Sequence, residues 1–145
     1  MKQLFILLFA PALLLFSFQK KQINRPALLT GEPPKNIILM IGDGMGLTQI
    51  TAGLYSNGNS LHLENFPISG LIKTHSSSHL ITDSGAGATA FSCGCKTFNG
   101  AIGVCADKNP CLTILEQAEQ QGIATGLVAT SSITHATPAS FIAHV

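Results

Sequence analysis

The sequence predicts an α/β fold with a largely parallel central sheet flanked by helices. Residues 37–41 form a continuous apolar run with β-branched residues at both ends, and residues 123–130 form a second run of this kind. Such runs are typical of strands buried on both faces, as in a parallel sheet. Helical patterns lie between and after them, so the expected order is strand, helix, helix, strand and the start of a helix. In such folds ligands bind beyond the carboxyl ends of the strands.

The N-terminal segment, residues 1–18, is predicted to be a secretory signal peptide. A lysine near its start precedes an apolar run, and Lys20 and Lys21 follow it. A membrane anchor and a buried helix are the alternatives. The uninterrupted apolar stretch from Leu4 to Phe16 is shorter than the roughly 20 residues that span a bilayer, which argues against an anchor. We therefore expect an exported protein, periplasmic or extracellular, without a stable membrane anchor.

Residues 19–35 are the expected linker, because residues 22–35 contain three prolines and a glycine. Residues 36–145 are the expected folded portion. They carry three lysines and six acidic residues, a net charge of −3. Since no basic patch remains in this portion, we expect no nucleic-acid interface.

The first expected helix follows the first strand. Leu47, Ile50 and Leu54 have helical spacing, and Asn57-Gly58 ends the pattern. Residues 68–79 alternate loosely between apolar and polar side chains, so we expect them to be extended.

Three further helices are expected. Residues 84–95 are rich in alanine and favour a helix, although two glycines weaken it. Asn109-Pro110 is a plausible cap and first turn for a helix that runs through Gln121 and ends at Gly122. Thr137-Pro138 could start a last helix that continues to the end of the sequence.

The four cysteines, at positions 93, 95, 105 and 111, have no spacing typical of a zinc finger. In an exported chain, Cys105 and Cys111 could close a small surface loop through a disulfide. Free buried thiols are the alternative.

Asp43 is the first candidate for chemistry. It directly follows the first predicted strand and lies between Gly42 and Gly44, so its carboxylate is expected at the carboxyl end of that strand. A carboxylate in this place can bind a hard or borderline cation. An ordinary turn residue in Gly-Asp-Gly is an equally good interpretation of this motif alone.

Asp83 and Ser84 are the second candidates. Ser84 precedes a run of Gly and Ala, which places it in the first turn of a helix, where free N–H groups and the helix dipole favour an anion. A serine hydroxyl becomes a nucleophile only with a nearby base or a metal. No catalytic triad is evident and GxSxG is absent. From these residues alone, Asp83 or Ser84 could equally be a simple helix cap.

Three segments together resemble the alkaline phosphatase family. They are Asn36–Gly46 (NIILMIGDGMG), His79–Gly103 (HLITDSGAGATAFSCGCKTFNGAIG) and Ala129–Val145 (ATSSITHATPASFIAHV). They look like three N-terminal signatures of that family, in the same order. The resemblance implies a phosphatase that hydrolyses small-molecule phosphate monoesters through a phosphoserine.

The resemblance also implies roles for particular residues. Asp43 matches an aspartate that bridges a zinc and a magnesium ion, and Ser84 matches the zinc-bound nucleophile. Asp83 matches the acid that helps to orient a phosphate-binding arginine, and Thr137 matches a magnesium ligand. His135 falls where members have Asp or His near the magnesium ion, so it could either contact the metal through water or tune metal preference. The implied cofactors are two zinc ions and one magnesium ion.

Other polar residues receive structural interpretations. Lys96-Thr97 and Asn99-Gly100 are expected to shape the loop after the helix that begins at Ser84, which we call the serine helix. None of the remaining histidines falls in a matching ligand position; they are His62, His75, His79 and His144.

Complete alkaline phosphatases are several times longer, and their other zinc ligands, their magnesium glutamate and their arginine have no counterpart here. We therefore expect this chain to be the truncated N-terminal portion of a longer protein, a homodimer when complete, and to be inactive alone. A related phosphodiesterase or sulfatase is disfavoured, because diesterases often use Thr and sulfatases need a Cys/Ser-x-Pro-x-Arg motif. A non-catalytic remnant that binds phosphate or metal is the remaining alternative.

Overall fold

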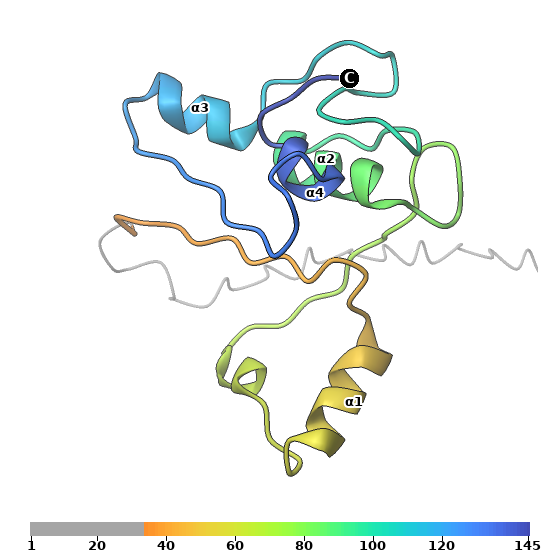
Figure 1. The fold of residues 1–145 in the computed structure, drawn as a ribbon, viewed down its shortest axis with the longest axis vertical. Coiled ribbons are helices and arrows are strands. Elements are labelled where there is room, and N and C mark those ends of the chain that lie inside the picture. Colours follow the sequence, from red (N-terminus) through yellow and green to blue (C-terminus); the bar gives the residue numbers. More distant parts are fainter. Residues whose placement is uncertain (1–33) are drawn as a thin grey trace, which may run out of the picture. The chain divides into compact units, whose positions relative to one another are not determined.

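The computed structural model describes residues 34–145, and Figure 1 shows their course. The predicted signal peptide and nearly all of the predicted linker lie outside these residues. The chain divides into two units, Met1–Leu39 and Met40–Val145. The described part of the first unit, residues 34–39, has no regular secondary structure, and the helices of the described residues all lie in the second unit.

The second unit contains four α-helices and one 3₁₀-helix among its described residues. In chain order these are α1 (Leu47–Ser56), η1 (His62–Asn65), α2 (Ser84–Cys93), α3 (Ile114–Gln120) and α4 (Ala136–Ala139). Helix α2 packs against both α3 and α4, and Figure 1 shows α2 and α4 together. Within residues 34–145, no helix has the length and apolar composition that crossing a bilayer requires.

No strand forms within residues 34–145, which differs from the expected sheet. The segments at 37–41 and 123–130 are irregular, and their apolar side chains are exposed, at 85% for Ile37 and 101% for Val128. Residues 68–79 likewise form no strand. A strand requires a neighbour that pairs with its N–H and C=O groups, and these segments have none among the described residues. The parallel sheet therefore stays a prediction.

Helices α1 and α2 confirm two predicted helices. Helix α1 ends before Asn57, as predicted, and has no buried residues. Helix α2 begins at Ser84 after its N-cap Asp83, and five of its ten residues are buried. Small side chains allow this close packing: a Cβ built on Gly85 would lie 2.8 Å from the carbonyl oxygen of Ala101, so only glycine fits there.

The predicted start of the third helix at Asn109-Pro110 is wrong, because α3 begins after Thr113. Residues 103–111 instead form a tight loop, in which Cys105 N–H donates to Asn109 O and Cys111 N–H donates to Gly103 O. Thr113 and Glu116 then form a capping box, with Glu116 N–H donating to Thr113 Oγ1 (3.1 Å) and Thr113 N–H donating to Glu116 Oε2 (2.8 Å). This reciprocal cap sets the helix start.

Helix α4 is shorter than predicted. It begins at Ala136, one residue before Thr137, and ends after Ala139. The following segment does not continue the helix, because Val145 exchanges two backbone hydrogen bonds with Ile102, of 2.7 and 2.8 Å. Pairing with Ile102 therefore replaces the last helical turns.

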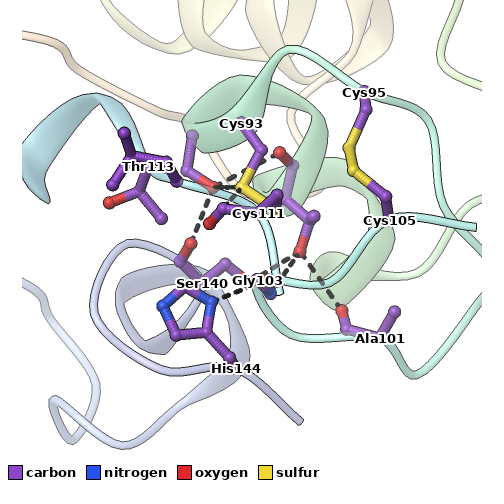
Figure 2. Close-up of a disulfide and its surroundings, with 12 residues drawn as sticks. Cys93, Cys95, Ala101, Gly103, Cys105, Cys111, Thr113, Ser140 and His144 are labelled. Carbon is purple, nitrogen blue, oxygen red and sulfur yellow. Dashed lines mark hydrogen bonds between the residues drawn. A yellow bond between two sulfur atoms is a disulfide. The ribbon is translucent and has the colours of Figure 1, made fainter. Parts of the chain in front are cut away.

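Both expectations for the cysteines are wrong. Cys93 is bonded to Cys111 and Cys95 to Cys105, and none of the four thiols is free (Figure 2). The physical reason is the position of α2, which ends at Cys93. It places Cys93 and Cys95, on the two sides of Gly94, beside the 103–111 loop, so each pairs with a different cysteine of that loop.

Helices α2, α3 and α4 and the 103–111 loop form what we call the packed region. Its centre contains several buried hydroxyl side chains. Thr89, Ser92, Thr113 and Ser140 are fully buried. Ser92 Oγ donates to Ser140 O (2.6 Å), and Thr113 Oγ1 donates to Phe141 O (2.8 Å). These four hydroxyls all have hydrogen-bond partners, so they hold α2 against its neighbours without the desolvation penalty of unpaired groups. The buried Oγ1 of Thr97, in the loop that follows α2, has no partner among the described residues.

Candidate active site

Asp43 lies in a tight turn that precedes α1, in which Met45 N–H donates to Gly42 O (3.0 Å). Its two carboxylate oxygens accept hydrogen bonds from two distant segments. Ser84 Oγ donates to Oδ1 (3.1 Å), and Thr137 Oγ1 donates to Oδ2 (2.7 Å). Three of the residues that the sequence singled out therefore meet around one carboxylate.

Asp83 has a different task from Ser84. Its Oδ1 accepts from Ala86 N–H (2.9 Å) and its Oδ2 accepts from Gly100 N–H (2.6 Å). Asp83 is thus the N-cap of α2 and also fastens the loop at 96–100 to the start of the helix. The capping interpretation is correct for Asp83, and it leaves the hydroxyl of Ser84 available, since that hydroxyl does not cap the helix.

The loop that follows α2 supports this arrangement, as predicted. Asn99 Nδ2 donates to Ile81 O (3.0 Å), one residue before Thr82 and close to the cap. Lys96 Nζ reaches further and donates to the carbonyl oxygens of Lys73 (2.8 Å) and His75 (2.5 Å). The sequence gave no signal for this long-range role of Lys96, because the contact depends on how residues 73–75 return to the loop.

A cavity of about 810 Å³ opens beside these residues. The residues that line it include Asp43, Asp83, Ser84, Lys96 and Thr137. The first turn of α2 therefore faces a space large enough for a small organic anion.

His135 is not brought into this group. It is the N-cap of α4, but its side chain makes no capping hydrogen bond. It is exposed, and it does not line the cavity that Thr137 lines. A role for His135 toward a metal therefore stays a prediction.

The converging oxygens of Asp43, Ser84 and Thr137 are hard donors, and they fit part of a magnesium site, where the ion usually keeps several waters. They fit a zinc site less completely, because zinc in proteins is commonly bound by His or Cys as well. Among the described residues, no histidine joins Asp43 in a group of three or more metal-binding side chains. The three side chains therefore fit part of a magnesium site, and the described residues do not complete a zinc site.

The arrangement also indicates what it lacks. Ser84 Oγ donates to Asp43, so the carboxylate orients the hydroxyl. A carboxylate is too weak a base to keep a serine hydroxyl deprotonated. A bound cation is the remaining way to produce the serine oxyanion at this site.

A serine at the first residue of a helix, hydrogen-bonded to a carboxylate and beside a cavity, is the arrangement expected of hydrolases that use a serine nucleophile on an anionic substrate. The family can be stated more narrowly. The family model for alkaline phosphatase matches residues 34–145, and the chain belongs to the alkaline phosphatase family.

Curated relatives agree with this membership. The chain is 50% identical over 121 residues to the alkaline phosphatase of Schizosaccharomyces pombe, which covers 79% of this chain and 23% of the relative. It is 44% identical over 127 residues to the alkaline phosphatase of Escherichia coli K12, covering 81% of this chain and 27% of the relative. The chain therefore spans about a quarter of the length of these curated relatives.

Solved structures are similar as well. Alkaline phosphatase from the Antarctic bacterium TAB5 matches with a TM-score of 0.68 and 54% identity, over 71% of this chain and 30% of that chain. A cold-active alkaline phosphatase from Shewanella matches with a TM-score of 0.67 and 35% identity, over 72% of this chain and 28% of that chain. An alkaline-phosphatase-like fold is thus supported. Two further TAB5 structures, in which a histidine is replaced by Asp or Glu, have Mg bound in the M3 site.

Proposed function

We propose that this chain is the N-terminal portion of an exported alkaline phosphatase that hydrolyses phosphate monoesters through a phosphoserine at Ser84. The single observation that carries this proposal is the position of the Ser84 hydroxyl. It is on the first residue of α2 and 3.1 Å from Asp43 Oδ1. Family membership over residues 34–145 supports the reaction class.

The residues of the chain have distinct tasks in this reaction. The N–H groups in the first turn of α2, together with the helix dipole, attract the phosphate dianion. Asp83 keeps that turn in place through its bonds to Ala86 and Gly100. Ser84 Oγ attacks phosphorus, the bond from phosphorus to the leaving alkoxide breaks, and water later hydrolyses the phosphoserine to inorganic phosphate.

Two zinc ions and one magnesium ion are the proposed cofactors of the complete protein, and they would supply Lewis-acid stabilisation of the attacking and leaving oxygens. Asp43, Ser84 and Thr137 are the residues of this chain that would hold them. Both hydroxyls donate to the two oxygens of Asp43, so the three side chains already converge before any cation binds. We assign His135 a tuning role, supported by the magnesium-bound TAB5 structures in which a histidine is replaced.

The alternatives lose support. A phosphodiesterase or sulfatase is disfavoured by membership in the alkaline phosphatase family. A non-catalytic remnant would need neither the oriented hydroxyl of Ser84 nor the cavity beside it. The physiological phosphoester, homodimer formation and export are parts of the proposal that need the complete protein.

The test is Ser84→Ala in the complete protein, with Ser131→Ala as the matched control. Ser131 is exposed, and its hydroxyl donates only to the neighbouring Ser132 O within the described residues. We expect Ser84→Ala to lower kcat with a phosphate monoester by about three orders of magnitude or more, and Ser131→Ala to keep normal turnover. Full activity of a correctly folded Ser84→Ala protein would refute the assignment.

A further inference from the structure

Four cysteines from two neighbouring disulfides gather at the C-terminal end of α2 (Figure 2). The disulfides join Cys93 to Cys111 and Cys95 to Cys105. The Sγ atoms of Cys95, Cys105 and Cys111 all lie within 4.8 Å of one another. Because Cys93 Sγ is bonded to Cys111 Sγ, the fourth sulfur adjoins the same group. The four sulfurs form what we call the cysteine cluster.

Three sulfurs of the cysteine cluster, those of Cys95, Cys105 and Cys111, lie nearly as close together as the ligands of one tetrahedral thiolate site. Four thiolates about 2.3 Å from a zinc ion place neighbouring sulfurs about 3.8 Å apart. After reduction, Cys95, Cys105 and Cys111 need shifts of about 1–2 Å to reach that arrangement, and Cys93, which lies outside the 4.8 Å group, moves further. Four thiolates in tetrahedral geometry are typical ligands of structural zinc.

Backbone hydrogen bonds shape the two segments that carry these cysteines, in addition to the S–S bonds. Cys105 N–H donates to Asn109 O and Cys111 N–H donates to Gly103 O, both at 3.0 Å. Val104 and Pro110 form a bridge inside the same loop. Cys93 is the last residue of α2, which is held by its buried face. The four side chains are half-buried, so a reductant and a cation can reach them.

We propose that the cysteine cluster binds one Zn²⁺ when both disulfides are reduced, and that the ion then replaces the disulfides as the crosslink. A dithiol supplies two electrons and two protons to each disulfide and is itself oxidised to a disulfide. The four protein thiols then bind Zn²⁺ as thiolates and release four protons. The zinc would fasten the end of α2 to the 103–111 loop in reducing surroundings. This site is independent of the proposed phosphatase function.

The first experiment titrates the reduced chain, freed of dithiol under nitrogen, with Co²⁺ and then with Zn²⁺. We expect one Co²⁺ per chain, with thiolate charge-transfer and tetrahedral d–d bands, and displacement by equimolar Zn²⁺. The oxidised chain is the control and should show no such bands. Asp43→Asn should leave the bands unchanged, since the proposed active-site ligands of this chain are oxygens. Absence of the bands in the reduced chain, or equal binding by the oxidised chain, would overturn the proposal.

A second measurement separates a folded site from thiols of an unfolded chain. Zn²⁺ added to the reduced chain should return the amide hydrogen exchange of residues 84–93 to the level of the oxidised chain. Cys105→Ser should weaken Zn²⁺ binding by more than about 100-fold, beyond the loss caused by an outer-shell partner. Zinc binding that leaves those amides unprotected, or that survives Cys105→Ser unchanged, would contradict the proposal.

Discussion

Helices α1 and α2 are both ten residues long, but they are held in different ways. No residue of α1 is buried, whereas half of α2 is. The hydroxyl of Thr51 in α1 donates to Leu47 O, one turn earlier in the same helix. The hydroxyl of Thr89 in α2 instead contacts Ala101 O and accepts from Gly103 N–H. Tertiary packing therefore fixes the serine helix, and the interactions of α1 are local.

The difference explains how the candidate site is assembled. Ser84 belongs to the packed region, and Thr137 lies on α4, which packs against α2. Asp43 precedes α1 and is joined to that region by its two hydrogen bonds to Ser84 and Thr137. The hydroxyls are thus positioned by the fold, and the carboxylate is positioned largely by the site itself.

Among substitutions that test this difference, the largest loss of stability is expected at Gly103, in the packed region. Its φ is +58°, and an added Cβ would run into the carbonyl oxygen of Ala143. Gly122 has a similar φ of +74° but open space around its Cβ. We expect Gly103→Ala to lower the free energy of unfolding by more than about 3 kcal/mol and Gly122→Ala by about 1–2 kcal/mol. Equal denaturation midpoints for the two variants would contradict the claim that tight packing around Gly103 makes its substitution the more costly one.

A smaller effect is expected from two matched threonine changes. Thr89→Val leaves the buried N–H of Gly103 without its acceptor, which should cost about 1–3 kcal/mol. Thr51→Val in α1 removes an exposed hydroxyl with a local bond, so we expect a change within about 0.5 kcal/mol. Urea denaturation of both variants checks this. If Thr51→Val lowers the free energy of unfolding more than Thr89→Val does, the claim that tertiary packing holds α2 and local bonds hold α1 is wrong.

The smallest change in stability is expected from the ion pair of Glu116 and His144, which joins α3 to the C-terminal segment. His144 Nδ1 lies 2.6 Å from Gly103 O, and Nε2 lies 2.9 Å from Glu116 Oε1. Both partners are acceptors, so both ring nitrogens donate when the imidazole is charged. The bonds to Gly103 O and Glu116 raise the pKa of His144, while bonds from Thr113 N–H and His144 lower the pKa of Glu116.

These directions determine the expected pH dependence. The contribution of His144 is complete below its ordinary pKa of 6.5 and is lost as pH rises through its raised folded pKa. The contribution of Glu116 is complete above its ordinary pKa of 4.5 and is lost as pH falls through its lowered folded pKa. The Tm difference between the unchanged chain and His144→Gln should therefore be largest between these values and should shrink at alkaline pH. A difference independent of pH would exclude the charged pair.

The sequence predicted those parts of the fold that depend on local signals. The C-terminal end of α1 follows from Asn57-Gly58, and the start of α2 follows from the cap at Asp83. The start of α3 also has a local signal, the capping box of Thr113 and Glu116, but Asn109-Pro110 carries a competing signal for a helix start four residues earlier. The short length of α4 had no local signal, because it depends on the pairing of Val145 with Ile102.

The candidate site was predicted in its residues and only partly in its geometry. Asp43, Ser84 and Thr137 were selected from motifs, and the structure brings them together. The disulfide pairing could not be predicted, because four cysteines allow three pairings and spacing does not decide among them. The predicted strands at 37–41 and 123–130 have no partner among the described residues, so their apolar patterns alone do not produce a sheet.

The most direct test of the central claim identifies the residue that carries phosphate during turnover. The complete protein is mixed with a phosphate monoester, quenched in acid, and digested for mass spectrometry. We expect phosphate on Ser84 and none on Ser78 or Ser92, which precede and follow it in the chain. Turnover with phosphate on another residue, or with none on the peptide that contains Ser84, would contradict the account.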